Sequence, residues 1–109
     1  MTGKEFQTHA MRTANGAIDR HYDRLVNGVL GLTGEAGEVA DLVKKFLFQG
    51  HDLDREHIIE EVGDVLWYCA LIADSCGTNL DHVMQTNVDK LSLRYPDGFS
   101  AQNSINREV

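Results

Sequence analysis

Four acidic residues form two pairs with the same spacing, and they carry the clearest chemical signal in the chain. Glu35 and Glu38 lie three positions apart, and Glu61 and Asp64 repeat that spacing further along the sequence. Because residues three apart share one face of a helix, each pair would present its two carboxylates together. Carboxylate oxygens, with no His or Cys at matching spacing, suit a hard cation such as Mg²⁺ or Mn²⁺ better than zinc.

Both pairs fall on the apolar faces of their segments. With about 100° of rotation per residue, Glu35 and Glu61 each lie inside an apolar stripe, and Glu38 and Asp64 lie at its border. An ionised carboxylate in an apolar interface is costly unless a cation or hydrogen bonds compensate. One such pair alone is typical of a solvated helix surface. Two pairs on the apolar stripes of neighbouring antiparallel helices favour four carboxylates gathered at one metal site.

The elements that would position these acids are helices. The only proline is Pro96, so the residues before it lack the strongest helix breaker. Apolar residues recur at steps of three and four, and turn and capping signals separate the runs. The sequence predicts an all-α domain with helices at about residues 4–15, 22–48 and 55–75, and a last helix that opens at the capping signal of residues 78–81 and runs to about 94.

Several local features add detail to this predicted arrangement of helices. A turn is expected at Asn15-Gly16, and the tail beyond Pro96 is polar and predicted to be irregular. Glycines in the first half of the 22–48 segment indicate either a broken helix or a close approach by a neighbouring helix. The 55–75 helix is apolar nearly all round and is therefore expected to be central. On it, Tyr68 lies on the side of the acids, whereas Trp67 is expected to point away into a core or subunit interface.

The composition describes one acidic globular domain of 109 residues with a formal charge of −7. Nucleic acids and anionic membranes attract clustered positive charge, so neither is an expected partner. No apolar run has the length of a transmembrane helix, and the first residues lack the pattern of a signal peptide. We expect a cytoplasmic protein with one domain at residues 1–100 and a polar C-terminal tail at residues 101–109.

The last predicted helix carries a second cluster of polar residues. Asn87, Lys90 and Arg94 are spaced three and four apart, which places them on one face, separate from the apolar face. Two cations and an amide on one face predict a grip for phosphate groups. A basic helix end that interacts with the helix dipole is the structural alternative.

The acid pairs and their flanks resemble a known family. Glu35-Ala36-Gly37-Glu38 and Glu61-Val62-Gly63-Asp64 match an ExxE, spacer, ExxD signature, and residues 87–91 and 94–100 match its C-terminal pattern. Residues 6–100 thus resemble the MazG-like superfamily of all-α nucleoside triphosphate pyrophosphohydrolases. Gly34 departs from that pattern, because many relatives carry an additional acid before the first pair.

The resemblance implies a four-helix, MazG-like bundle completed by homo-oligomerisation, as a homodimer or homotetramer. It implies Mg²⁺-dependent hydrolysis of a nucleoside triphosphate between the α and β phosphates, with Mn²⁺ as the alternative ion. The metal ligands would be Glu35, Glu38, Glu61 and Asp64, with Glu35 also orienting or deprotonating the attacking water. The substrate-binding residues that it implies are Tyr68, Asn87, Lys90, Arg94 and Tyr95.

The sequence leaves other functions open. A relative specialised for dUTP, dCTP or phosphoribosyl-ATP would carry the same acids, because base selection depends on pocket shape. A ferritin-like di-iron bundle is disfavoured, because its helices carry Glu-x-x-His and the second pair here ends in Asp64. A non-catalytic helical interaction or regulatory module that has kept the acids is the alternative from another class.

Overall fold

The structure, a computed structural model, describes residues 1–14 and 21–107. Over these residues the regular structure is helical, with one isolated β-bridge between Pro96 and Gly98. The helices are α1 (Gly3–Met11), α2 (His21–Phe48), α3 (Arg55–Ser75), α4 (Leu80–Arg94) and α5 (Ala101–Ile105). The all-α fold class predicted from the sequence is confirmed.

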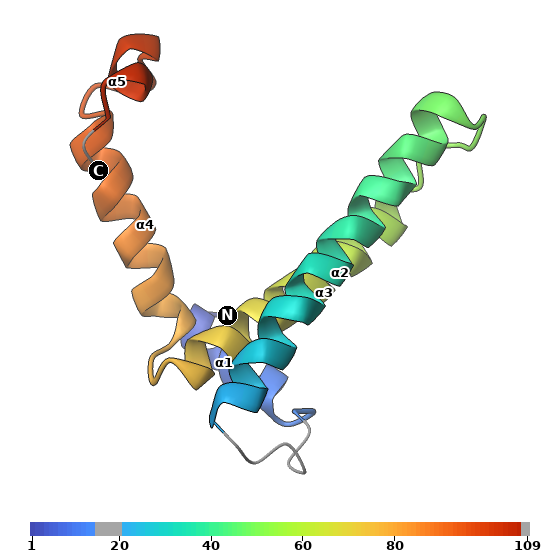
Figure 1. The fold of residues 1–109 in the computed structure, drawn as a ribbon, viewed down its shortest axis with the longest axis horizontal. Coiled ribbons are helices and arrows are strands. Elements are labelled where there is room, and N and C mark those ends of the chain that lie inside the picture. The colour runs from blue at the N-terminus through green and yellow to red at the C-terminus, as the bar shows by residue number, and fades with distance from the viewer. Residues whose placement is uncertain (15–20, 108–109) are drawn as a thin grey trace.

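The helices form a V with two separate arms (Figure 1). Antiparallel α2 and α3 pack along each other and make one arm, and α4 with α5 makes the other. α1 lies at the bend, where it packs against α3 and α4. Because α4 runs away from the α2–α3 arm, a single chain does not close a four-helix bundle.

Local capping explains where the helices begin and end. Thr2, Asp54 and Asn79 are the N-caps of α1, α3 and α4, and each side chain accepts a hydrogen bond from a backbone N–H of the first turn. Gly50 and Gly77 follow α2 and α3 with a φ of 74°, the left-handed conformation that ends a helix readily at glycine. The three longer helices agree closely with their predicted ranges.

Four local predictions need correction or comment. α1 ends at Met11 rather than near residue 15, because the following backbone amides turn back onto the last carbonyls of the helix. The turn predicted at Asn15-Gly16 lies outside the described residues. α2 is unbroken despite its glycines. The tail is not wholly irregular, because Ser100 caps the short helix α5 by accepting from the N–H of Asn103.

The buried core is small and lies at the bend of the V. Gln7 of α1 fixes the start of α4, because its side-chain amide donates to the carbonyl of Thr78 and accepts from the N–H of Leu80. α3 is the central helix, as predicted, since it packs against α1, α2 and α4. The buried apolar residues of this cluster are Ala10, Ala70, Ala73 and Leu80.

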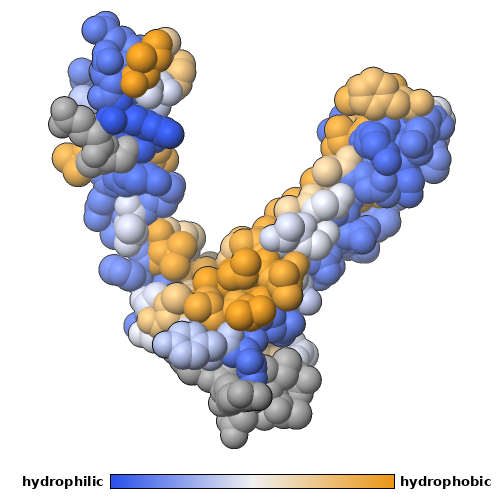
Figure 2. Space-filling view, viewed as in Figure 1, coloured by the Kyte–Doolittle hydropathy of each residue, from blue (hydrophilic) through white to orange (hydrophobic). Residues whose placement is uncertain are grey.

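The chain exposes more surface than a compact domain of its size. Its Cα radius of gyration is 16.9 Å, against about 13 Å for a compact domain of this length. Its accessible surface is 7984 Å², whereas about 6,100 Å² is typical of a folded monomer of its mass. Apolar surface gathers at the bend and continues along the inner side of the α2–α3 arm (Figure 2).

The hydropathy and length of the helices decide whether any of them could cross a membrane. Among the residues that the structure describes, no helix combines the length and the apolar character needed to cross a membrane.

Candidate metal centre

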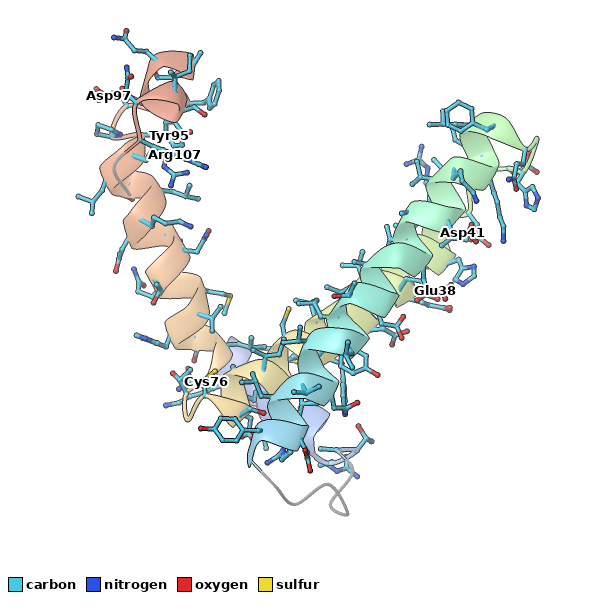
Figure 3. The ribbon with its side chains drawn as sticks, viewed as in Figure 1. Glu38, Asp41, Cys76, Tyr95, Asp97 and Arg107 are labelled. Carbon is cyan, nitrogen blue, oxygen red and sulfur yellow. The ribbon has the colours of Figure 1, made fainter. Side chains whose placement is uncertain are left out.

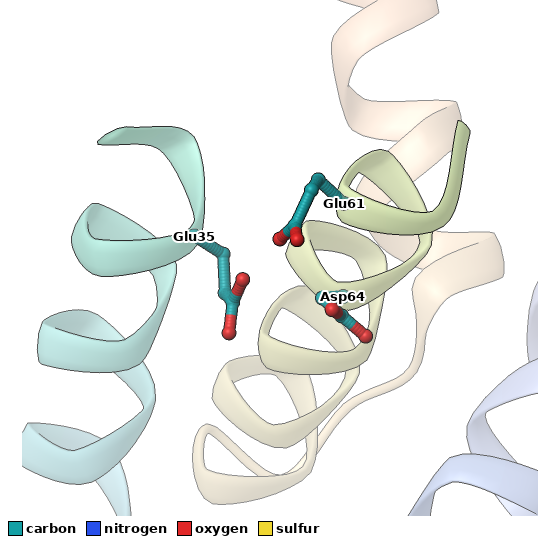
Figure 4. A group of neighbouring side chains, drawn as sticks. All are labelled: Glu35, Glu61 and Asp64. Atoms are coloured by element: carbon teal, nitrogen blue, oxygen red, sulfur yellow. The ribbon is translucent and has the colours of Figure 1, made fainter. Parts of the chain in front are cut away.

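Three of the four predicted acids meet between α2 and α3. Glu35 projects from α2 toward Glu61 and Asp64 on α3 (Figure 4). One carboxylate oxygen from each of the three lies within 4.8 Å of the others. The side chain of Glu61 is only 16% exposed, and Glu35 is half-buried, whereas Asp64 is exposed. The arrangement is a shallow acidic site that opens to solvent on one side.

Two glycines let the helices come close enough for this meeting. A Cβ at Gly31 would overlap the ring of Tyr68, and one at Gly28 would stand 2.8 Å from Cγ1 of Ile72. Both glycines lie on α2 one to two turns before Glu35, and both contacts are made with α3. Close packing by a neighbour, one of the two outcomes that the glycines predicted, is thus the one observed.

The carboxylates perturb one another electrostatically. The pKa of Glu35 is raised, first because its side chain forms a hydrogen bond with Glu61, which requires a shared proton, and next because burial disfavours its charge. The negative charges of Asp64, Glu61 and Glu38 raise the pKa further. Without a cation, a proton thus relieves part of the repulsion at this site.

Glu38 lies one turn further along α2 and is exposed. It projects from the arm near Asp41 (Figure 3), and its oxygens are not among those that meet within 4.8 Å. Its charge still contributes to the raised pKa of Glu35. Asp41 forms ion pairs with Lys45 at 2.9 Å and Lys44 at 3.4 Å, which lower the pKa of its own carboxyl group. Glu38 as a fourth ligand therefore stays a prediction.

A cavity of about 350 Å³ adjoins the carboxylates on the side of the bend. Glu35 and Asp64 line it together with Thr13, Trp67 and Tyr68. The Trp67 indole N–H donates to the carbonyl of Ala10 and to the hydroxyl of Thr13, at 3.0 and 2.9 Å. Trp67 packs against the core as predicted, but it does not point away from the acids, because α1 turns its indole into the cavity wall.

Sequence reasoning missed one neighbour of the acids. Nε2 of His57 lies 3.2 Å from Oε1 of Glu61, one turn earlier on α3. The spacing of four between a histidine and an acid on one helix is the signal in the sequence that could have indicated this contact. His57 also lines a second cavity, of about 710 Å³, at the turn between α2 and α3.

The predicted phosphate-binding residues lie on the other arm. Asn87 and Lys90 are exposed on α4, and Tyr95 lies at the far end of that arm (Figure 3). The guanidinium carbon of Arg94 stands 5.9 Å from the centre of the Tyr95 ring, which in turn packs against Phe99. Within one chain α4 does not bring these residues to the carboxylates.

The donor set fits a hard divalent cation. Three carboxylates converge, no sulfur lies among the converging ligand atoms, and the open side leaves room for water and phosphate oxygens. A dication in place of the proton that Glu35 and Glu61 share would relieve the same repulsion more completely.

Comparisons with known proteins show the family of the chain. Residues 27–99 match the MazG nucleotide pyrophosphohydrolase domain. The Gene 37 protein of Mycobacterium phage L5 is 38% identical over 82 residues, which span 72% of this chain and 72% of the relative. The uncharacterized protein YvdC of Bacillus subtilis (strain 168) is 34% identical over 74 residues, 59% of this chain and 69% of the relative. No solved structure matches the chain significantly.

The chain belongs to the MazG nucleotide pyrophosphohydrolase domain family. The match covers α3 and α4 and most of α2, including both acid pairs. It supports an enzyme of the pyrophosphohydrolase type with a nucleotide as its substrate. The family assignment made from the acid pairs and the C-terminal pattern is thus confirmed.

Proposed function

We propose that this protein hydrolyses a nucleoside triphosphate between the α and β phosphates, with Mg²⁺ as its cofactor and Mn²⁺ as the alternative. The observation that carries the proposal is the convergence of Glu35, Glu61 and Asp64 beside a cavity with aromatic walls. When bound there, the dication supplies Lewis-acid activation of the α-phosphoryl group and lowers the pKa of a bound water. The products are a nucleoside monophosphate and pyrophosphate.

The carboxylates have two roles in this proposal. Glu61 and Asp64 on α3 and Glu35 on α2 hold the cation, and Glu38 completes the set from the exposed side. Glu35 also orients the attacking water and accepts its proton, because it lies half-buried where the acids meet and the pKa of its carboxyl group is raised.

The cavity beside the carboxylates suits the nucleoside end of the substrate. Its walls combine the Tyr68 and Trp67 rings with the Thr13 hydroxyl, and the two rings meet edge to face at 5.0 Å. Tyr68 lies one turn past Asp64 on α3, so its hydroxyl is proposed to hydrogen-bond the sugar or the α phosphate. The proposal does not depend on one preferred base, and it includes dUTP and dCTP as substrates.

The phosphate grip on α4 requires a second copy of the chain in this proposal. Asn87, Lys90, Arg94 and Tyr95 lie on the arm that leads away from the carboxylates of the same chain. The excess surface over a compact monomer is about 1,900 Å², which is comparable to what each subunit of an obligate dimer hides. We propose a homodimer, or a homotetramer built from it, in which α4 of one subunit lies over the carboxylates of its partner. We also propose a cytoplasmic location, because the proposed substrate is a nucleoside triphosphate.

The test is product identity across a panel of nucleoside triphosphates. We expect pyrophosphate and the matching monophosphate from at least one of them in the presence of Mg²⁺, and no turnover in excess chelator. Release of inorganic phosphate with a diphosphate would instead identify a phosphatase. No hydrolysis of any member with either Mg²⁺ or Mn²⁺ would favour the non-catalytic module.

A further inference from the structure

Glu61 is one of the two half-buried acids of the candidate metal centre, and a histidine lies beside it on α3. The His57 Nε2 to Glu61 Oε1 distance is 3.2 Å, and the two side chains are 46% and 16% exposed. The backbone of His57 is fixed as well, because its N–H donates to Oδ1 of Asp54, the N-cap of α3, at 3.0 Å. The imidazole is therefore anchored in the first turn of α3, at a set distance from the acid.

Glu61 thus stands between two partners. On the α2 side one of its oxygens lies within 4.8 Å of an oxygen of Glu35, and on the side of the α2–α3 turn it meets His57. The imidazole contact does not involve α2, so it is the contact that still fixes the Glu61 side chain when a cation lies between the two helices.

We propose that His57 is a positioning residue for Glu61, an inference that rests on the proposed metal site. Its Nε2–H donates to Oε1 of Glu61 and keeps that carboxylate turned toward α2. The remaining lone pairs of Glu61 then face Glu35 and Asp64, where the cation is held. Hydrogen bonds of this kind orient metal ligands, and their loss typically weakens metal binding by about 10- to 100-fold.

An ordinary surface pair on a helix is the competing explanation. Such a pair, four residues apart, supports the helix but leaves ligand affinity unchanged. The low exposure of Glu61 and its place among three converging carboxylates argue against it. The two explanations differ in one measurable quantity, the affinity for the cation without any nucleotide present.

The experiment titrates the full-length protein with Mn²⁺ at one fixed pH and measures the free ion by electron paramagnetic resonance. Wild type, His57→Ala and His57→Gln are compared, because the Gln side-chain amide can place a donor where Nε2 stands. His51→Ala is the matched control, since His51 lines the same cavity but its imidazole makes no hydrogen bond to the described residues; its backbone N–H donates to the carbonyl of Lys45, a bond that the substitution keeps. Asp64→Ala supplies the reference for a lost ligand.

We expect His57→Ala to bind Mn²⁺ about 10- to 100-fold more weakly, and His57→Gln and His51→Ala to bind within about threefold of wild type. Wild-type affinity in His57→Ala would overturn the positioning role, and so would a His57→Gln variant as weak as His57→Ala. Either result leaves the metal site standing if Asp64→Ala loses binding. No binding by the wild type would instead remove the metal site itself. Circular dichroism of each variant verifies that the helices are intact.

Discussion

The ring of Tyr68 lies directly on the backbone of Gly31, at the crossing of α2 and α3 beside the carboxylates. A side chain at position 31 would have to displace the ring, because the Cβ would overlap it. Tyr68 also lines the cavity with Glu35 and Asp64. The absence of a side chain at Gly31 therefore sets both the helix spacing and the wall of the candidate site.

Gly31→Ala is expected to lower the free energy of unfolding by about 1–3 kcal/mol, because overpacking at this contact outweighs the better helix propensity of alanine. Gly37→Ala is the matched control on the same helix, since a Cβ there meets no atom within 4 Å. It should gain up to about 1 kcal/mol. Denaturant unfolding of the two variants measures both changes, and equal stabilities would contradict the contact.

Substitution of the acids should abolish turnover without unfolding the chain. Glu61→Ala and Asp64→Ala should each lose about a hundredfold or more in kcat, since a missing ligand removes several kcal/mol of charge stabilisation. Glu38→Ala tests whether the exposed fourth acid belongs to the set. Glu60→Ala, an exposed acid next to Glu61 in sequence, is the control. Full activity in all three ligand variants would exclude the metal assignment.

The raised pKa of Glu35 predicts how the metal-free protein responds to pH. The folded state binds this proton more tightly than the unfolded chain does, so its stabilisation is present below the ordinary carboxyl pKa. That stabilisation is lost as the pH rises through the raised pKa. Glu35→Gln should lack this loss and should melt higher than wild type once the pH exceeds that range.

Thermal unfolding of wild type and Glu35→Gln from about pH 4 to about pH 7 measures the difference, in which the titration of other groups cancels. Mg²⁺ should restore the wild-type melting temperature at the upper end, because the dication replaces the proton. Parallel curves for the two proteins across the range would show that Glu35 does not titrate abnormally.

Lys90→Ala and Arg94→Ala should each lower kcat/KM by about 10- to 100-fold, because charge-assisted contacts to phosphate are lost. If α4 acts on the partner subunit, Glu61→Ala and Lys90→Ala should complement each other when mixed. A mixed dimer then contains one site with an intact carboxylate set and an intact α4. Recovery of activity on mixing supports completion by the partner, and no recovery after subunit exchange contradicts it.

The open V predicts association. Light scattering at micromolar concentration should give the mass of at least a dimer, because the exposed apolar surface is too large for a stable monomer. An exposed apolar side chain of α4, such as Val88 at 55% exposure, can test the interface. Val88→Asp should shift the mass toward the monomer and lower specific activity in parallel, whereas a fully active monomeric wild type would refute the proposed assembly.

Interactions between residues close together in the chain made much of the fold predictable from the sequence. The helices around both acid pairs followed from apolar periodicity, and in the structure Asp54 caps the start of α3 while Gly77 follows its end with a left-handed backbone. The chemistry of the site followed from acid spacing, since residues three apart share a helix face in any helix. The family likewise followed from motifs that are contiguous in the chain.

Contacts between helices were beyond the sequence. The spacing placed Glu35 inside the apolar stripe and Glu38 at its border, but it did not say that only Glu35 would meet the acids of α3 within 4.8 Å, because that depends on how α2 is rotated against α3. The inward turn of Trp67 depended on where α1 ends, and hence on the bonds of its indole to Ala10 and Thr13.

The sequence by itself determined the helices, the pairing of the acids and the preference for a hard cation, because these depend on neighbours within one or two turns. The tertiary structure decided that three acids meet within 4.8 Å, that His57 holds one of them, and that α4 leads Lys90 away from all of them. These outcomes depend on the approach of Gly31 to Tyr68 and on the bend fixed by Gln7. Such contacts join residues far apart in the chain, where periodicity carries no information.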